Sequence, residues 1–364
     1  MLIFIFFVFL CVNLILAFHE KTFDFISLAT MFFLWFMITG SRSDYDLSYY
    51  IQGYDNIMKI NIDSQITFYY LRKIFHFLNF SFFEFRSFFV SVSLFLMYYF
   101  FRRTSLNIHL AFASYMLYLF FLDYIQFRNF LAAGVFYVAL SILLSQGKRW
   151  KIWYTLVIVL AATIHSSFWA YLIFLLIPSI EWKNSKMIKT IALMTLFFSI
   201  ISVFFRNFLS GAVDIVSIID SEKSIRYAGL STNFGGLYYI LLHLYSASAV
   251  GFLLWQTKLK KNELYVNGYN NLINIRKTLQ IIFYADLLAF AFCPLVVFSI
   301  TFYRLLRNLY LLNIVGLSLF GIRGKQSWVF FLIVIYILLW ICVELTGANF
   351  NNLVMPLFNS NVYF

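Results

Sequence analysis

Residues 128–145 read RNFLAAGVFYVALSILLS and hold 17 uncharged residues behind a single arginine. A membrane-spanning helix uses roughly 20 mostly apolar residues, so this run is long and apolar enough to cross a bilayer. The strands of an outer-membrane barrel would alternate apolar and polar side chains with a period of two residues, and this run does not. It therefore predicts a transmembrane helix.

The same pattern continues through nearly the whole chain. Of the 364 residues, 63% are hydrophobic and only 12% are charged, against roughly 25% charged residues in a soluble domain. Apolar runs of membrane length lie near residues 1–18, 25–40, 84–101, 108–122, 128–145, 150–164, 166–180, 187–205, 236–255, 278–300, 303–320 and 327–345. The sequence thus predicts an all-α polytopic integral membrane protein of about 12 transmembrane helices, in a single transmembrane domain over residues 1–364. It excludes a soluble enzyme, a nucleic-acid binder and a disordered tail.

Basic residues are concentrated in alternate connections between these runs. With the N-terminus outside, 16 of the 27 lysines and arginines fall in inner connections, among them Lys148, Arg149 and Lys151. Positive charge collects on the cytoplasmic side of membrane proteins, so we expect both termini to lie outside. The net charge of +12 is spread between the runs instead of forming one patch, which argues against a nucleic-acid partner.

The basic residues on the predicted outer side are mostly arginines. Of these 11 residues eight are arginine, against five of the 16 inner ones. The eight are Arg42, Arg72, Arg86, Arg128, Arg206, Arg226, Arg304 and Arg307. Topology does not require positive charge outside, whereas a planar guanidinium binds phosphate or carboxylate oxygens in pairs. The arginine excess therefore predicts an anionic ligand at the outer face.

The first long outer segment, residues 41–83, carries Tyr45, Tyr49 and Tyr50. Helical spacing would put one polar stripe and one apolar stripe on opposite faces of a helix within it. The polar stripe is Tyr69, Arg72, Lys73 and His76, and the apolar stripe is Phe68, Leu71, Phe75 and Leu78. We expect a helix in the outer interface whose basic stripe faces the site. The alternative is a helix that only closes the loop, with its charges among the lipid headgroups.

The second long outer segment, residues 206–235, carries Arg226 and ends beside Gly235 and Gly236. Paired glycines permit hinge motion, so this segment is a candidate lid that contacts substrate. A solvated connector is the alternative, and Arg226 is the residue of this segment to which we assign a ligand contact.

Other polar residues lie at the outer ends of apolar runs. Arg128 stands before Ala132-Ala133-Gly134, small residues that let helices approach closely. His165 lies in the turn before Ser166 and Ser167, either of which would cap the next helix.

Arg304 and Arg307 are one helical turn apart. Burying an arginine in a span costs on the order of 3 kcal/mol, so both are expected to face protein, water or a ligand. Asp286 lies deeper, and an ion pair with one of these arginines is its simplest explanation.

No motif of a soluble enzyme is present: no phosphate-binding loop, no HExxH, no CxxC pair and no nucleophile elbow. Asp44-Tyr45-Asp46 has the D-x-D spacing that holds divalent ions, but so short a motif arises often by chance. Arginines also neutralise a diphosphate without an ion. The sequence therefore predicts neither a metal ion nor another cofactor, with a metal at Asp44 and Asp46 as the alternative.

In chain order, these features resemble a known family. The features are many spans, Arg42-x-Asp44 followed by Tyr49 and Tyr50, Arg128 before small residues, His165-Ser166-Ser167, and Tyr303-Arg304. They are similar to those of the bacterial Wzy-type polymerases of O-antigen, capsule or exopolysaccharide, including the EpsG-like branch. The chain lacks the very large outer loop that many O-antigen polymerases carry between late spans. The resemblance implies a GT-C-like glycosyltransferase architecture in the bacterial inner membrane.

The resemblance also implies the reaction and the partners. A growing glycan would move from undecaprenyl diphosphate to the terminal sugar of another lipid-linked repeat unit, at the periplasmic face. The donor and acceptor, membrane lipids and optionally a chain-length regulator would be the partners, with no nucleic acid.

Such a reaction assigns roles to the outer residues. The leaving diphosphate needs preorganised cations, for which the candidates are Arg128, Arg226, Arg304, Arg42, Arg72 and Arg307. The acceptor hydroxyl needs a base, either His165 or Asp44, and we prefer His165 because Asp44 can instead orient Arg42. Tyrosines suit sugar rings, and the candidates are Tyr45, Tyr49 and Tyr50. For each residue taken alone, a purely structural role is an alternative.

Other functions fit part of the pattern. A flippase of lipid-linked sugars would also have an arginine-lined cavity, but transporters show internal repeats and broken helices near the midplane. The chain has no evident repeat and only three prolines. An O-antigen ligase or a membrane acyltransferase shares the spans, arginines and histidine, whereas an inactive scaffold would leave the outer arginines unexplained. Polymerase is the prediction, with flippase and ligase as alternatives.

Overall fold

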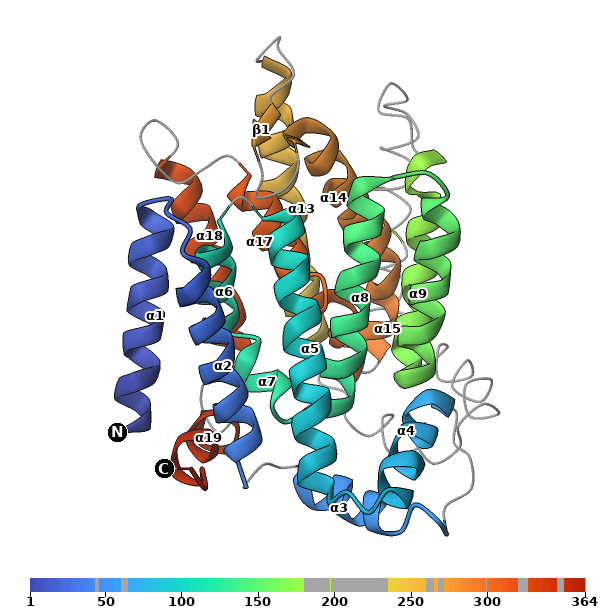
Figure 1. The fold of residues 1–364 in the computed structure, drawn as a ribbon. Coiled ribbons are helices and arrows are strands. Elements are labelled where there is room, and N and C mark those ends of the chain that lie inside the picture. The colour runs from blue at the N-terminus through green and yellow to red at the C-terminus, as the bar shows by residue number, and fades with distance from the viewer. Residues whose placement is uncertain are drawn as a thin grey trace. The chain divides into compact units, whose positions relative to one another are not determined.

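The chain folds almost entirely into helices, as the sequence predicts (Figure 1). The computed structural model describes residues 1–42, 46–59, 65–105, 107–179, 197, 235–259, 265–267, 272–298, 300–319, 327–345 and 350–363. The chain divides into two compact units. Unit 1 comprises Met1–Leu172, Tyr265–Ile275 and Leu317–Phe364, and unit 2 comprises Ile173–Leu264 and Arg276–Gly316.

Unit 1 is built around α5, α8 and α9, which pack side by side (Figure 1). Its N-terminal helices are α1 (Leu2–Phe18), α2 (Asp24–Gly40), α3 (Leu47–Asp55), α4 (Ile66–Phe77), α5 (Phe82–Thr104), α6 (Ile108–Leu117), α7 (Phe120–Asp123), α8 (Phe127–Ser145) and α9 (Trp150–Ile164). The 3-10 helix η1 (Ser166–Ser179) follows α9, and the boundary between the two units, at Leu172 and Ile173, falls within it. The later parts of unit 1 include strands β1 (Tyr265–Asn267) and β2 (Leu272–Asn274), α18 (Ser327–Glu344), the π-helix η5 (Phe350–Val354) and α19 (Met355–Asn359).

Unit 2 consists of helices joined by short 3-10 turns. Its elements are α13 (Gly235–Leu259), α14 (Ile275–Ala289), η2 (Phe290–Phe292), α15 (Cys293–Phe298), η3 (Ile300–Tyr303), α16 (Arg304–Arg307) and α17 (Tyr310–Ser318). Helix α13 packs against α15 and η3.

Local sequence signals account for the long helices of unit 1. Helix α5 begins with a capping box, in which Ser81 N–H donates to Glu84 Oε2 at 2.7 Å and Glu84 N–H donates to Ser81 Oγ at 3.3 Å. Helix α8 packs closely on α5 at Gly134, where an added Cβ would lie 3.1 Å from Ser93 Cα. The prediction that small residues allow a close helix approach here is confirmed.

The predicted count of twelve spans is not supported. Among the described residues four helices are long and apolar enough to cross a membrane, namely Phe82–Thr104, Phe127–Ser145, Gly236–Thr257 and Ile275–Val297. The shorter apolar helices are Leu2–Phe18, Asp24–Gly40, Ile108–Leu117, Trp150–Ile164, Ser166–Ile177 and Trp328–Glu344. The predicted run 187–205 lies outside the described residues except for Phe197. The fold is therefore that of an all-α membrane protein.

The regular α-helical geometry is interrupted in three predicted spans. Run 108–122 breaks between α6 and α7 at Tyr118, whose φ of −139° and ψ of −73° leave the helical region. Run 278–300 changes to 3-10 geometry at η2 but stays helical up to Val297, and Pro294 occupies the first turn of α15, where its missing N–H is tolerated. Run 303–320 divides into α16 and α17. The strands β1 and β2, which pair antiparallel with Tyr265 opposite Asn274, were not predicted.

The helices of unit 1 alternate in direction, which gathers their connections at two ends. At one end, Asn107 Nδ2 donates to Ala17 O at 2.8 Å, and Arg102 forms an ion pair with Asp24. At the other end, Arg86 joins Ser41 to Tyr124, and Thr67 Oγ1 donates to Thr163 Oγ1 at 2.9 Å. Helices α3 and α4 lie at this second end, which corresponds to the predicted outer side (Figure 1).

Candidate functional site

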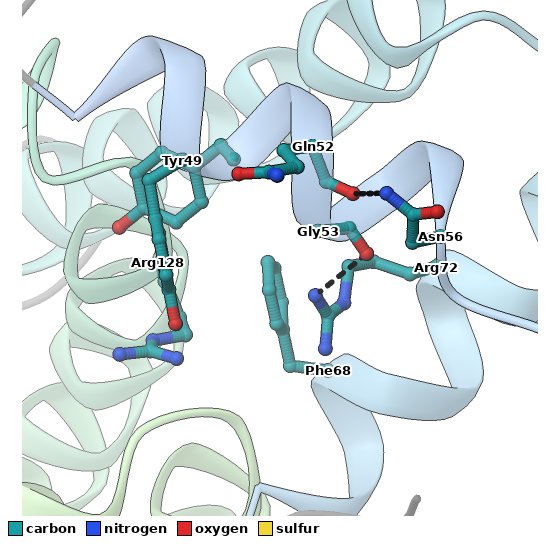
Figure 2. A pocket seen from close by; sticks show the side chains of 8 residues that line it. Tyr49, Gln52, Gly53, Asn56, Phe68, Arg72 and Arg128 are labelled. Atoms are coloured by element: carbon teal, nitrogen blue, oxygen red, sulfur yellow. Dashed lines mark hydrogen bonds between the residues drawn. The ribbon is translucent and has the colours of Figure 1, made fainter. Parts of the chain in front are cut away.

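A pocket of about 300 Å³ opens in unit 1 where α3 and α4 meet the start of α8. Its lining residues are Tyr49, Tyr50, Gln52, Gly53, Asn56, Phe68, Arg72 and Arg128 (Figure 2). Three separate elements contribute, because α3 supplies the residues up to Gly53, α4 supplies Phe68 and Arg72, and α8 supplies Arg128. The pocket brings together four residues to which the sequence analysis assigned ligand contacts: Tyr49, Tyr50, Arg72 and Arg128.

Arg72 is held in place by both helices of the outer segment. Only 9% of the residue is exposed. Its Nη1 donates to Gly53 O at 3.3 Å, and its guanidinium carbon lies 4.9 Å from the centroid of the Phe68 ring. A buried cation fixed against a carbonyl and an aromatic face is preorganised, because its position does not depend on a bound ligand.

Arg128 faces the same ring. Its guanidinium carbon lies 5.9 Å from the Phe68 centroid, and Figure 2 shows the ring between the Arg128 and Arg72 side chains. Arg128 is half-buried, and it donates no hydrogen bond to any residue in the part of the chain that the structure describes. A pocket with two guanidiniums on one aromatic ring, one of them still able to donate, is suited to an anion with several oxygens.

The faces of α4 differ from the predicted stripes. Phe68 and Arg72 are both buried, whereas Lys73 and Leu78 are both exposed. The prediction of a basic stripe opposite an apolar one is wrong, because Phe68 and Arg72 are four residues apart and share one face of the helix. The cation lies over the ring instead of away from it.

Helix α3 and its C-cap residue Asn56 supply polar side chains that were not predicted from the sequence. Gln52 and Asn56 line the pocket beside Tyr49, at spacings of three and seven residues from it. The opposite face of α3 carries Leu47 and Tyr54, which are buried. Tyr54 donates to Phe80 O at 2.8 Å, and its burial, followed by the charges of Glu84 and Asp55, raises its pKa to about 12. The spacing of Gln52 and Asn56, three and seven residues after Tyr49, was the sequence signal that would have placed all three on one face of a helix.

Two of the outer arginines have structural contacts. Arg86 is 1% exposed and donates to Ser41 O at 3.1 Å and Tyr124 O at 2.9 Å. Arg42 donates to Thr39 O at 2.8 Å and lies 3.7 Å from the centroid of Phe83, outside the residues that line the pocket. Burial lowers the pKa of Arg42, and the charge of Tyr363 partly opposes this shift. The outer arginine excess is therefore partly structural.

His165 lies at the end of α9 and does not line the pocket. Its neighbour Thr163 bonds to Thr67 of α4, so the histidine is at the same end of unit 1 as the pocket. The Ser167 N–H donates to His165 Nδ1 at 3.4 Å, and Ser167 Oγ lies 2.9 Å from the same nitrogen. A backbone N–H only donates, so Nδ1 is unprotonated and the neutral ring presents Nε2–H.

Arg304 and Arg307 belong to α16 in unit 2. Arg307 is fully buried and donates to Tyr303 Oη at 3.1 Å, while Arg304 is half-buried. Asp286 does not pair with either: its Oδ1 accepts from Asn313 Nδ2 at 3.1 Å, and its backbone oxygen accepts from His243 Nε2 at 2.8 Å. The suggested ion pair is wrong, because the hydrogen bond that the Asp286 carboxylate accepts comes from Asn313 and not from an arginine.

Three predicted site residues, Asp44, Tyr45 and Arg226, lie outside the described residues. No group of three or more potential metal-ligating side chains occurs within the described ranges. The pocket described above has two chemically different sides. Its cationic, aromatic floor consists of Arg72, Arg128 and Phe68, and its polar, uncharged wall consists of Tyr49, Gln52 and Asn56. Such a pocket can bind a polar group that carries phosphate.

The comparisons with known proteins agree with a membrane role. Residues 24–359 match the sequence model of the EpsG family, a family of membrane proteins related to Wzy-like polysaccharide polymerases. No curated protein and no solved structure matches the chain significantly.

Proposed function

Because the chain belongs to the EpsG family, we propose that it is a polysaccharide polymerase that uses a lipid-diphosphate-linked glycan as donor. The acceptor is the terminal sugar of a second lipid-linked repeat unit. The observation that carries the proposal is the pair of guanidiniums, Arg72 and Arg128, on the Phe68 ring in a pocket of about 300 Å³.

The pocket chemistry matches the leaving group of this reaction. The acceptor hydroxyl oxygen forms a bond to the anomeric carbon of the donor while the bond from that carbon to the diphosphate oxygen breaks. The diphosphate leaves with the electron pair, and the hydroxyl proton passes to a base. Cations already in position stabilise the charge that develops on the leaving oxygen. We assign this role to Arg128 and Arg72, and we keep Arg226, Arg304, Arg307 and Arg42 as further candidates.

Two residues compete for the role of base. His165 presents Nε2–H and would have to release the Ser167 contact before Nδ1 could accept a proton. Asp44 would accept the proton directly. Separate pH–rate profiles of His165→Ala and Asp44→Asn distinguish the two, because only loss of the base removes the acidic limb of the profile.

The remaining parts of the proposal concern placement and partners. We place the protein in the bacterial inner membrane, with the pocket and both termini at the periplasmic face. The proposal also includes twelve spans in a GT-C-like arrangement and undecaprenyl as the lipid. It further includes an O-antigen-type product and a reaction that needs no metal ion. Tyr49, Tyr50 and Tyr45 contact sugar rings.

A flippase is the second candidate, favoured by one observation. Helix α6 breaks at Tyr118 inside an apolar run, and Tyr118 Oη donates to the buried Glu344 Oε1 at 2.8 Å. Broken helices with buried ionisable groups are common in transporters.

The test is polymerisation by purified protein, with synthetic lipid-linked repeat units and a gel that resolves chain length. Wild type should give a ladder, and Arg128→Lys should lower the rate by about 10–100-fold despite its retained charge, because lysine cannot bind two oxygens in a planar fork.

Lys73→Ala is the matched control, because Lys73 is an exposed cation one residue from Arg72 on the same helix. It should keep the wild-type rate, and all variants should be unaffected by a chelator. Full activity of Arg128→Lys would contradict the phosphate assignment, and purified wild type that forms no ladder would remove the polymerase proposal.

A further inference from the structure

The α3 side of the pocket is polar but uncharged. Tyr49, Gln52 and Asn56 contribute a phenol and two carboxamides, which offer donors and acceptors without a formal charge. Figure 2 shows these side chains along α3, with the guanidiniums of Arg72 and Arg128 below them in the view. The arginine floor is suited to phosphate, so the α3 wall is available for a different part of the same ligand.

The Asn56 carboxamide has a fixed orientation. Its Nδ2 donates to Gln52 O at 3.0 Å. A carbonyl oxygen only accepts, so the nitrogen must face Gln52 and Oδ1 must face the other way. Gln52 is exposed, and no described residue accepts from or donates to its side chain. The wall thus combines one oriented acceptor with one amide that is able to adapt, a combination suited to the hydroxyl groups of a sugar.

The pocket volume limits how much of a glycan can lie against this wall. Small-molecule sites span roughly 300–1,000 Å³, and this pocket is at the lower limit, at about 300 Å³. A diphosphate and one sugar ring are therefore the part of a lipid-linked glycan that fits. With the diphosphate at Arg72 and Arg128, the ring within reach of α3 is the one bonded directly to it.

We propose that Gln52 and Asn56 bind hydroxyl groups of the sugar that is bonded to the diphosphate, so that α3 selects the first sugar of the lipid-linked unit. This inference rests on the proposed function, because it takes the arginine floor as the diphosphate site. It adds a specificity role to two residues of the same pocket.

The test compares binding of a bare lipid diphosphate with binding of its glycosylated forms. The full-length protein is purified in detergent and titrated with undecaprenyl diphosphate, and with the same lipid carrying glucose, galactose, N-acetylglucosamine or N-acetylgalactosamine. Native mass spectrometry gives each Kd. Wild type should bind at least one glycosylated probe about fivefold more tightly than the bare lipid, the gain that one or two neutral hydrogen bonds provide.

Asn56→Ala and Gln52→Ala should abolish this sugar preference and change the Kd of the bare lipid less than about twofold, since neither side chain is charged. Ser48→Ala, an exposed α3 residue outside the pocket, should keep the preference. Arg128→Ala should weaken all probes in parallel.

The outcomes separate the two proposals. A sugar preference that survives both amide substitutions, or a wild type without any preference, overturns the role of α3. Bare-lipid binding that is insensitive to Arg128→Ala overturns the diphosphate site instead.

Discussion

Single arginines with the same sequence context have different roles in this protein. Arg86 is the fifth residue of α5 and Arg128 is the second residue of α8, so both lie near the start of a long helix. Composition alone does not distinguish their roles. Arg86 is buried and donates to two backbone carbonyls, whereas Arg128 lines a pocket and donates to none of the described residues. Within this pair, two hydrogen bonds to backbone carbonyls indicate that Arg86 supports the fold, whereas the pocket position of Arg128 leaves its guanidinium available to a ligand.

Gly53 is a sensitive position for the cationic floor. An alanine Cβ there would lie 3.3 Å from Arg72 Nη1, so the guanidinium would have to move by a few tenths of an ångström. Alanine also favours helix by about 1 kcal/mol over glycine. We expect Gly53→Ala to keep or raise the melting temperature and to lower the polymerisation rate about threefold to tenfold, because small displacements of preorganised groups weaken catalysis. An unchanged rate would show that the position of Arg72 is not critical.

Tyr54 gives the outer segment a pH dependence. Its hydroxyl donates to Phe80 O, and its pKa is raised to about 12 in the folded protein. A raised pKa in an acid means that the folded state favours the protonated form. The stabilisation is therefore complete below the ordinary pKa of about 10 and is lost as pH rises towards 12.

Thermal melts of wild type and Tyr54→Phe between pH 8 and pH 11 measure this effect. At pH 8 the variant should be less stable by about 0.5–1.5 kcal/mol, the contribution of one hydrogen bond. The difference should shrink above about pH 10. A difference that grows with pH would contradict the assigned hydrogen bond.

At the scale of helices, α5 packs against α8, the helix that carries Arg128. Gly134 allows α8 to lie against the backbone of Ser93, with 3.1 Å between an added Cβ and Ser93 Cα. Since these neighbours are backbone atoms, they cannot rotate away. We expect Gly134→Leu to destabilise the protein by about 1–3 kcal/mol through overpacking.

Gly147→Leu is the control for this prediction. Gly147 follows the same helix, and an added Cβ there has no atom within 4 Å. The melting temperature of the Gly147→Leu variant in detergent should match that of wild type. Equal melting temperatures for both variants would show that α5 and α8 do not pack through Gly134.

Hydrophobic runs predict the elements of this fold better than the breaks within them. The predicted runs 128–145 and 150–164 agree with α8 and α9 to within one residue, because long apolar stretches have few alternatives to a helix. The break at Tyr118 was not predicted, since its partner Glu344 lies 226 positions away. Helix α3 was also missed, because it is short and mostly polar.

The charged residues of the candidate site could be predicted from the sequence, but its uncharged polar residues could not. Arg72 and Arg128 were chosen from the outer arginine excess, and both line the pocket. The positions of Gln52 and Asn56 were not apparent, because their relevance depends on α3 packing beside α4. The roles of all these residues stay predictions that the experiments above test.

At the scale of the whole molecule, the proposed reaction depends on which end of unit 1 faces outward. Two predicted inner cations lie at one end of unit 1: Arg102 is in the last turn of α5, and Lys148 follows the end of α8. Helices α3 and α4 lie at the opposite end. Alternate helix directions and the excess of basic residues in alternate connections agree with each other. If the pocket faced the cytoplasm, it would lie on the side of the membrane opposite to the one on which we propose that the reaction occurs.

Cysteine accessibility in intact cells tests this orientation. In a background without Cys11, Cys293 and Cys342, Met58→Cys marks the end that carries α3, because Met58 is 54% exposed. Lys148→Cys marks the opposite end of α8. A membrane-impermeant maleimide should label the first and not the second, while both should react after the membrane is permeabilised. The reverse pattern would place the pocket in the cytoplasm, and transport or glycan assembly from that side would replace polymerisation as the function consistent with the fold.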